Sequence, residues 1–200
     1  MGFNAWFFAR IDYQDKVKRL NESSMEMIWY PQTSQGNENR IFTAVNYAHY
    51  SWPDGFNFEG RDNPKQYDPI RSDPNLEDYN LDTKADAFVA YFQKMCTHYR
   101  STQLMHTFGN DFVFSNARKD FKNMDILFNY INKNSAKFNM KVVYSTPQDY
   151  VNTIYNNSLS PDNQIVYPDN NYDFFPYADF PNAFWTGYFT SRVELKRIVR

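Results

Sequence analysis

The sequence predicts an α/β fold that contains a parallel sheet. Between Leu81 and Tyr155, segments of helical and strand character alternate in the order helix, strand, helix, strand, helix. This order is typical of right-handed crossovers that join parallel strands. Residues 5–10 are nearly all apolar and end in a charge, a pattern that indicates a strand buried on both faces. A length of 200 residues suits one well-cored domain or a piece of a larger one.

The first 45 residues predict three short strands. The strands cover residues 5–10, 25–29 and 41–45, and a turn-forming stretch over 32–39 joins the second to the third. Arg10 then lies at the carboxyl end of the first strand, where ligands collect in α/β sheets. Residues 11–16 predict a polar loop or the start of a helix.

A long loop is predicted over residues 46–80. No period of two or 3.6 residues persists there, and proline and glycine recur along the stretch. Loops of this length in compact domains are usually functional or mobile. This one carries His49, Tyr50 and Trp52, whose side chains are candidates to line a pocket.

The most regular helix is predicted over residues 81–100, with Asp82 or Thr83 as its capping residue. Its apolar face contains Ala85, Phe88, Val89, Phe92, Met95, Cys96 and Tyr99. Met95 and Cys96 are therefore expected to pack in the core, because a buried cysteine usually acts as a small hydrophobic residue rather than as a redox or metal group.

The rest of the chain predicts two more strands and three more helices. The strands cover residues 103–108 and 141–144, and the helices cover 116–134 and 146–155 and begin again near Ser191. The first of these helices has an apolar face formed by Phe121, Met124, Leu127, Phe128 and Ile131. Thr146, Pro147 and Asp149 supply a cap, a first-position proline and a first-turn acid. Ser191 to Glu194 reads as a capping box, so a helix begins close to the last residue. The first residues already form a predicted strand, and both ends of the chain are therefore expected to be cut.

Asp111 is the first candidate for a chemical role. It follows the predicted strand 103–108 and the turn at Gly109, and catalytic groups collect at such turns in α/β sheets. The neighbouring Phe108, Phe112 and Phe114 are expected to shield it from water, which suits a proton donor that works near neutral pH. The alternative is that Asp111 caps or ends the turn before the following helix.

Composition excludes several classes of function. The 21 basic and 23 acidic residues are spread along the chain, with a formal net charge of −2, so no basic stripe indicates nucleic acid. No apolar span approaches the length of about 20 residues that a membrane helix needs. The single cysteine excludes an intrachain disulfide and a cysteine zinc cluster. The three histidines are far apart, which disfavours a metal site built within this chain.

Carboxylates and aromatic residues remain as the candidate chemical groups. The chain has 19 Phe, 16 Tyr and 4 Trp, a surplus that either stacks on sugar rings or reflects a genome rich in A and T. The carboxylates at turns and loops are Asp12, Asp111, Asp173 and Asp179, and the candidate stacking residues are Tyr50, Trp52, Tyr177 and Trp185. Paired carboxylates with stacking aromatics are the groups that hydrolyse glycosidic bonds.

Six motifs make the sequence resemble the lysosomal-type α-mannosidases of glycoside hydrolase family 38. They are Phe-Phe-Ala-Arg-Ile-Asp-Tyr-Gln-Asp-Lys at 7–16, Met-Glu-Met-Ile-Trp at 25–29, Gly-Asn-Asp-Phe at 109–112, Tyr-Ser-Thr-Pro at 144–147, Asp-Phe-Phe-Pro-Tyr-Ala-Asp at 173–179 and Phe-Trp-Thr-Gly-Tyr-Phe-Thr-Ser-Arg at 184–192. The resemblance covers essentially the whole chain.

The resemblance implies a retaining exo-mannosidase of lysosomal or vacuolar location that removes terminal α-linked mannose from glycoprotein glycans and uses zinc. Asp111 would be the general acid/base, and Arg10, Tyr50 and Trp185 would contact substrate. The fold would be a partial (β/α) barrel-like catalytic domain over residues 1–190, followed by the first turns of a helical domain over 191–200.

Two motifs of the family are absent from this sequence. The His-x-Asp-Pro-Phe-Gly-His motif, which carries the nucleophile and zinc ligands, would precede Met1, and a His-His-Asp motif would follow Arg200. The remainder of an α-mannosidase polypeptide is therefore the expected partner, and the chain alone is expected to be inactive. Two alternatives stay open, a mannose-binding module without hydrolysis and a chain that does not fold alone.

Overall fold

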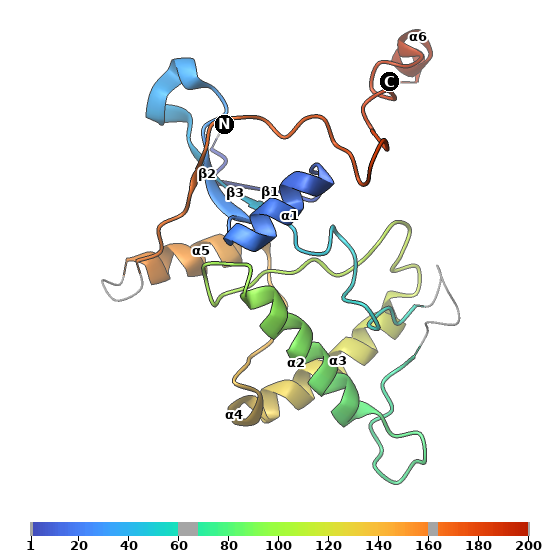
Figure 1. Ribbon diagram of the computed structural model, residues 1–200. Coiled ribbons are helices and arrows are strands. Elements are labelled where there is room, and N and C mark those ends of the chain that lie inside the picture. The colour runs from blue at the N-terminus through green and yellow to red at the C-terminus, as the bar shows by residue number, and fades with distance from the viewer. Residues whose placement is uncertain (1, 60–67, 160–163, 200) are drawn as a thin grey trace. The chain divides into compact units, whose positions relative to one another are not determined.

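The computed structural model describes residues 2–59, 68–159 and 164–199 (Figure 1). The chain divides into two compact units, and each is described by itself. Unit 1 contains residues 1–49, 98–100 and 166–200, and unit 2 contains residues 50–97 and 101–165. The elements of unit 1 are β1 (Ala5–Phe8), α1 (Tyr13–Glu22), β2 (Glu26–Trp29), the 3₁₀ helix η1 (Thr33–Asn39), β3 (Ile41–Val45), β4 (Asp169–Asn170) and α6 (Val193–Ile198). Those of unit 2 are α2 (Leu81–Cys96), α3 (Ala117–Lys133), α4 (Ser135–Phe138) and α5 (Pro147–Ser158).

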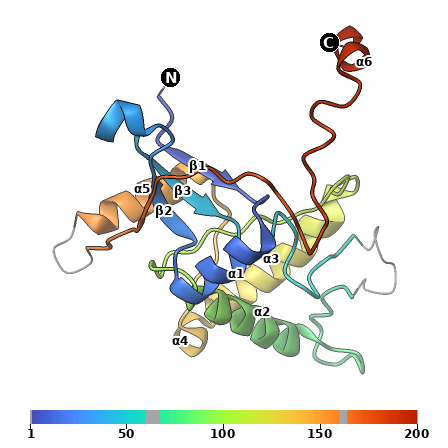
Figure 2. The same ribbon diagram turned by 45° about the horizontal axis from the view of Figure 1, so that its top comes forward.

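Unit 1 is built on a mixed sheet with the strand order β1-β3-β2-β4, and β1, β2 and β3 appear together with α1 in Figure 2. β1 pairs parallel with β3, and β2 pairs parallel with β4. β2 and β3, however, are antiparallel. The predicted parallel sheet is therefore only partly right. The connection through η1 is too short for a parallel crossover, which needs a dozen or more residues, whereas an antiparallel pair accepts a short link.

The core of unit 1 lies between the sheet and the segment around Phe174. Its buried residues are Ile11, Met25, Met27, Val45 and Phe174. The Phe174 ring lies 4.6 Å from Phe8 and 5.3 Å from Trp29, between ring centroids. Trp6 on β1 remains 37% exposed. The prediction that the first strand is buried on both faces is therefore wrong.

Arg19 of α1 is the central polar residue of unit 1. Its side chain is almost fully buried, and its Nε lies 3.0 Å from Asp15 Oδ1. The same guanidinium donates to the backbone carbonyl of Ser24 at 3.3 Å and to the Asn170 side-chain oxygen at 2.9 Å. These bonds join α1 to β4 and to the turn before β2. Burying a charge is tolerated because it is paired and fully hydrogen-bonded.

Unit 2 has its core between α2 and α3. The buried residues are Phe56, Phe58, Ile70, Leu81, Ala85, Phe88, Val89, Met124, Leu127, Phe128, Ile131 and Phe138. The two apolar faces predicted from helical spacing therefore meet, with three exceptions. Phe121 is 45% exposed, and Cys96 is only half-buried at the end of α2. Tyr99 lies beyond α2, which ends at Cys96 and not at residue 100 as predicted, and packs on the core of unit 1.

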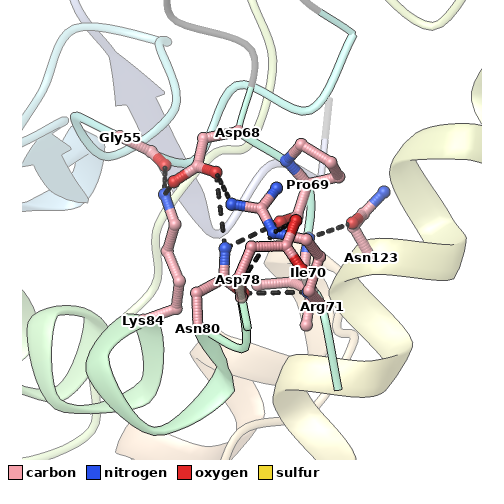
Figure 3. A network of polar contacts seen from close by, with 9 residues as sticks. All are labelled: Gly55, Asp68, Pro69, Ile70, Arg71, Asp78, Asn80, Lys84 and Asn123. Carbon is pink, nitrogen blue, oxygen red and sulfur yellow. Dashed lines mark hydrogen bonds and ion pairs between the residues drawn. The ribbon is translucent and has the colours of Figure 1, made fainter. Parts of the chain in front are cut away.

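A polar network fixes the described end of the long loop against α2 (Figure 3). Lys84 Nζ lies 2.7 Å from Asp68 Oδ2 and donates to the Gly55 carbonyl at 3.0 Å. The Asn80 side chain accepts from the Arg71 N–H at 2.8 Å. Asn80 is the N-cap position of α2 but makes no capping bond with its side chain. The predicted caps Asp82 and Thr83 are therefore wrong, because the helix begins earlier.

The remainder of the predicted loop over residues 46–80 has no helix or strand in its described part. Residues 60–67 of that prediction lie outside the described residues. Of the two alternatives predicted for residues 11–16, a polar loop or the start of a helix, the structure has the helix: α1 begins at Tyr13, and the Asp12 side chain accepts from the N–H groups of Gln14 and Asp15 at 2.9 and 3.2 Å.

The strands predicted over residues 103–108 and 141–144 are not formed. The Val142 N–H donates to Asn132 Oδ1 at 2.8 Å, and the Val142 carbonyl accepts from Asn132 Nδ2 at the same distance. The carbonyl of Gln103 accepts from the Tyr150 hydroxyl. Side chains thus form hydrogen bonds with backbone groups that would pair between neighbouring strands in a sheet. The alternation of helices and parallel strands predicted between Leu81 and Tyr155 is therefore wrong.

The ends of the last two helices give contrasting outcomes. The predicted cap of α5 is confirmed, since Thr146 is its N-cap and Thr146 Oγ1 accepts from the Asp149 N–H at 3.2 Å. The Asp149 carboxylate also accepts from the Thr146 N–H at 3.2 Å, which completes a capping box. A helix does begin where Ser191 indicated one, but Ser191 does not cap it. Its hydroxyl donates instead to the Gly187 carbonyl at 2.6 Å. The division at residue 190 into a barrel-like domain and a helical domain stays a prediction.

Asp120 is expected to destabilise the folded chain at neutral pH. It is 0% exposed, and its two carboxylate oxygens have no hydrogen-bond partner among the described residues. Burial, together with the nearby charge of Glu59, raises its pKa above the ordinary value of 3.8. Because the folded-state pKa is the higher one, the folded chain holds the proton longer, and stability falls as pH rises above 3.8.

We therefore expect Asp120→Asn to raise the free energy of unfolding at pH 7 by about 1 kcal/mol or more. The gain should shrink as the pH falls toward the range in which the wild-type carboxyl is protonated. Urea unfolding at pH 7 and pH 4.5 measures the gain in stability and its dependence on pH. Asp54→Asn, at an exposed acid, is the matched control. A loss of stability at pH 7, or a gain that does not depend on pH, would contradict this prediction.

Candidate functional site

Two of the predicted site residues, Arg10 and Trp185, lie together in unit 1. The guanidinium carbon of Arg10 is 5.1 Å from the centroid of the Trp185 ring and 5.4 Å from that of Tyr177. The two aromatic rings are 6.1 Å apart between centroids. Both distances from the cation are within the range of a cation–π contact.

Backbone hydrogen bonds hold this group in place. The Trp185 N–H donates to the Tyr177 carbonyl at 3.0 Å, beside an antiparallel bridge between Ala178 and Phe184. The Tyr13 N–H of α1 donates to the Ala178 carbonyl at 2.9 Å. The segment that carries Arg10, between β1 and α1, is thereby tied to the turn that carries both aromatic residues.

The surface formed by Arg10, Tyr177 and Trp185 suits a sugar. Trp185 is 43% exposed, so part of its ring is open to a ligand. Sugar rings present C–H groups that pack on aromatic faces, and a guanidinium donates hydrogen bonds to hydroxyl oxygens. Other exposed aromatic side chains of the same part of the chain are Phe175, Phe180, Phe184, Tyr188 and Phe189.

Asp111 belongs to unit 2 and lies in a turn before α3. The side chain is exposed. Phe112 is 82% exposed, while Phe108 and Phe114 pack on Trp52, at 6.1 and 5.1 Å between centroids. The prediction that the three phenylalanines shield Asp111 is therefore wrong, since their rings lie in the core or in solvent.

The alternative role of Asp111 as a helix cap is also not observed. The N-cap of α3 is Asn116. The Asp111 N–H donates to the Asn110 side chain at 2.9 Å. An exposed carboxylate without a capping function remains accessible to a large substrate.

The backbone around Asp111 is strained. Phe112 and Phe114 have φ values of 59° and 62°, a left-handed conformation that is uncommon for non-glycine residues. Such residues persist where surrounding contacts hold them, and they cluster at functional sites. The contacts here are the Trp52 N–H, which donates to the Gly109 carbonyl at 3.0 Å, and the Glu59 carboxylate, which accepts from the Phe114 N–H at 2.8 Å and the Asn116 N–H at 3.2 Å.

Tyr50, the fourth predicted residue, is half-buried and belongs to the same unit as Asp111. It precedes Trp52 by two positions, so the bond between Trp52 and Gly109 links the segments that carry Tyr50 and Asp111. Two of the other three proposed carboxylates have structural uses. Asp12 caps α1, and Asp173 accepts from the Phe175 N–H at 3.1 Å. One oxygen of Asp179 is buried without a partner among the described residues.

The part of the chain that the structure describes does not fit a zinc site. Over residues 2–59, 68–159 and 164–199, no three His, Cys, Asp or Glu side chains are grouped so that they could hold a metal ion. His98 Nδ1 contacts the Leu20 carbonyl at 2.8 Å, and His106 contacts the Tyr91 hydroxyl at 2.9 Å. Within the same described residues, no helix is long and apolar enough to cross a membrane.

Comparison with known proteins decides the family. The N-terminal domain of glycosyl hydrolases family 38 matches residues 1–180. The chain belongs to this family. This chain is 42% identical over 200 residues to a lysosomal α-mannosidase of Dictyostelium discoideum and 42% identical over 199 residues to an α-mannosidase of Arabidopsis thaliana. It is 36% identical over 210 residues to a human lysosomal α-mannosidase.

These alignments cover 100% of the family 38 chain but only 18% to 19% of each relative. The chain thus spans less than a fifth of the length of the α-mannosidases that it matches. The resemblance to lysosomal-type enzymes of family 38 is confirmed, and so is a mixed α/β architecture. The barrel and the roles of Arg10, Tyr50, Asp111 and Trp185 stay predictions.

Proposed function

We propose that this chain is one section of a retaining α-mannosidase that removes terminal α-linked mannose from glycoprotein N-glycans. In this proposal Asp111 is the general acid/base, and Arg10, Tyr50 and Trp185 contact the sugar. The observation that carries the proposal is the family match over residues 1–180 together with 42% identity to a lysosomal α-mannosidase. The proposed location, by analogy with that relative, is the lysosome or vacuole.

The accessible position of Asp111 suits both steps of a retaining mechanism. In the first step its protonated carboxyl group donates a proton to the glycosidic oxygen as the bond to the leaving group breaks. In the second step the resulting carboxylate removes a proton from the water that attacks the glycosyl-enzyme intermediate. Arg10 and Trp185 hold the mannose ring through hydrogen bonds and stacking, which orients the bond to be cleaved.

The nucleophile and zinc ligands are supplied, in this proposal, by the remainder of a longer polypeptide. The 200 residues contain no His-x-Asp-Pro-Phe-Gly-His motif, and the described residues do not fit a zinc site. No step assigned to this chain depends on the metal. We therefore expect the 200 residues alone to show no turnover of an α-mannoside, because the glycosyl-enzyme intermediate cannot form without its nucleophile.

The test uses the complete polypeptide that the transcript encodes. It should hydrolyse p-nitrophenyl α-mannoside and leave the β anomer intact, and NMR of the first product should show α-mannose, the sign of retention. Release of β-mannose first would contradict a retaining mechanism. Absence of hydrolysis by a folded complete polypeptide would remove the proposal as a whole.

A mannose-binding module without hydrolysis is the second candidate, favoured by the contacts of Arg10 with Tyr177 and Trp185. It predicts that mannose quenches the tryptophan fluorescence of the 200-residue chain. Trp185→Ala should abolish the quenching, because the stacking surface is lost. Trp6→Phe is the matched control, since Trp6 is similarly exposed at 37% but lies on β1. Quenching retained in Trp185→Ala would contradict this use of Trp185.

A further inference from the structure

The conformation of the turn around Asp111 depends on contacts from a distant part of the chain. Phe112 and Phe114, with φ values of 59° and 62°, each hold a left-handed conformation that is unfavourable for a non-glycine residue. The turn contains no regular helix or strand that would fix these residues. The Asp111 carboxylate can therefore keep one position only if other residues hold both ends of the turn.

Both ends are held by one segment, residues 52–59 of the long loop. At the first end, the Trp52 N–H donates to the Gly109 carbonyl at 3.0 Å. At the second end, the Glu59 carboxylate accepts two backbone hydrogen bonds through its two different oxygens, from Phe114 at 2.8 Å and from Asn116 at 3.2 Å. Bonds from backbone N–H groups to a carboxylate are about twice as strong as neutral ones.

Glu59 is itself placed by the core of unit 2. Its neighbour Phe58 is 0% exposed, and Phe56 is 3% exposed; the Phe56 ring lies 5.3 Å from that of Phe88 on α2. Lys84 of the same helix donates to the Gly55 carbonyl at 3.0 Å. The segment that carries Glu59 is thus packed and hydrogen-bonded to α2, so its carboxylate is a fixed point for the turn.

We propose that Glu59 is a positioning residue for the hydrolytic reaction, because its carboxylate fixes the turn that presents Asp111. The proposal rests on the proposed function of Asp111 as the general acid/base. Glu59 acts through the backbone of residues 114 and 116 and does not touch substrate. Its loss should mainly lower the rate of proton donation by Asp111, since a displacement of about 1 Å can cost about 100-fold in rate.

The test measures kcat and KM of the complete polypeptide with two mannosides that differ in leaving group. Glu59→Ala should lower kcat by about 100-fold for a mannoside with a poor leaving group, such as methyl α-mannoside, with little change in KM. For 2,4-dinitrophenyl α-mannoside, whose leaving group departs without protonation, the loss in kcat/KM, which reports the first step, should be much smaller. Glu59→Gln, which keeps one of the two acceptor oxygens, should lie between wild type and Glu59→Ala.

A second measurement reports on the turn itself. In the complete polypeptide, Glu59→Ala should speed hydrogen exchange of the Phe114 and Asn116 amides by at least about tenfold, while the amides of α2 and α3 keep their protection. Asp54→Asn is the matched control, because Asp54 is an exposed acid in the same loop segment. It should change neither exchange nor kinetics.

The outcomes separate the two proposals. A wild-type polypeptide without α-mannosidase activity would overturn the proposed function, and the role of Glu59 with it. If Asp111 variants behave as expected for an acid/base but Glu59→Ala loses the same factor in kcat/KM with both substrates, or matches Asp54→Asn, only the Glu59 proposal is overturned. A uniform rise in exchange over all amides would also overturn it, because Glu59 would then serve the stability of the whole unit.

Discussion

Asp111→Asn in the complete polypeptide is expected to lower kcat for methyl α-mannoside by about 10²- to 10⁴-fold, the usual contribution of a positioned general acid or base. The amide has nearly the shape of the carboxyl group but cannot donate a proton to the leaving oxygen. Because Asp111 is exposed in a turn and is not the N-cap of α3, the change should not reduce stability. Steady-state kinetics with methyl α-mannoside and 2,4-dinitrophenyl α-mannoside measure the loss of activity, and a thermal melt measures the stability.

The loss should depend on the leaving group. With 2,4-dinitrophenyl α-mannoside the first step needs no acid, so the second step becomes rate-limiting and KM should fall along with kcat. Asp73→Asn is a suitable control, since this exposed carboxylate also serves a local turn, in which it accepts from the Asn75 N–H at 3.0 Å. Equal losses in kcat/KM, which reports the first step, with the two substrates would mean that Asp111 does not act as the acid.

Arg19→Ala is expected to destabilise unit 1 by about 3 kcal/mol or more, because it leaves buried partners of the charge unpaired. The partners include Asp15, Asn170 and the Ser24 carbonyl. Arg19→Lys should lose nearly as much, since an ammonium group cannot reproduce a guanidinium that donates in several fixed directions. Urea unfolding followed by tryptophan fluorescence measures the change, because Trp6 and Trp29 belong to this unit.

The exposed Arg40 provides a matched control. Arg40→Ala should change the free energy of unfolding by no more than about 0.5 kcal/mol, as is usual for surface substitutions. If Arg19→Ala proves as mild as Arg40→Ala, the network around Arg19 does not hold α1 to β4, and the packing of Phe174 against the sheet must do so alone.

Local signals in the sequence predicted helices well. Thr146 caps α5 and Pro147 follows it, as predicted, and the apolar spacing of α2 and α3 gives the core of unit 2. These features depend on residues three or four positions apart, which a single sequence shows directly. Phe121 is the exception, because a helical pattern identifies an apolar face but not where the neighbouring elements stop covering it.

Strand pairing and the environment of Asp111 could not be predicted in the same way. Val142 is a residue type that favours strands, but its backbone N–H and carbonyl form hydrogen bonds with the Asn132 side chain. No local pattern in the sequence distinguishes such a side-chain partner from a neighbouring strand. Glu59 reaches Phe114 across 55 residues. Its only sequence signal is its place next to Phe56 and Phe58, whose alternation in an otherwise irregular loop indicates a packed segment.

The site residues were proposed from motifs, and the structure supports part of their grouping. Arg10 and Trp185 are far apart in the sequence, yet the bond from Tyr13 to the Ala178 carbonyl brings their segments together. The bond from the Trp52 N–H to the Gly109 carbonyl joins the segments that carry Tyr50 and Asp111. Such contacts arise from the path of the backbone, which residue types alone do not reveal.

The most direct test of the central claim is chemical rescue of Asp111→Ala in the complete polypeptide. A retaining enzyme without its acid/base still forms the glycosyl-enzyme intermediate from 2,4-dinitrophenyl α-mannoside, and azide, which needs no general base, can then attack it. We predict that azide raises kcat and that the product is α-mannosyl azide. If azide leaves the rate unchanged and no α-mannosyl azide forms, Asp111 is not the acid/base and the account given for this chain is wrong.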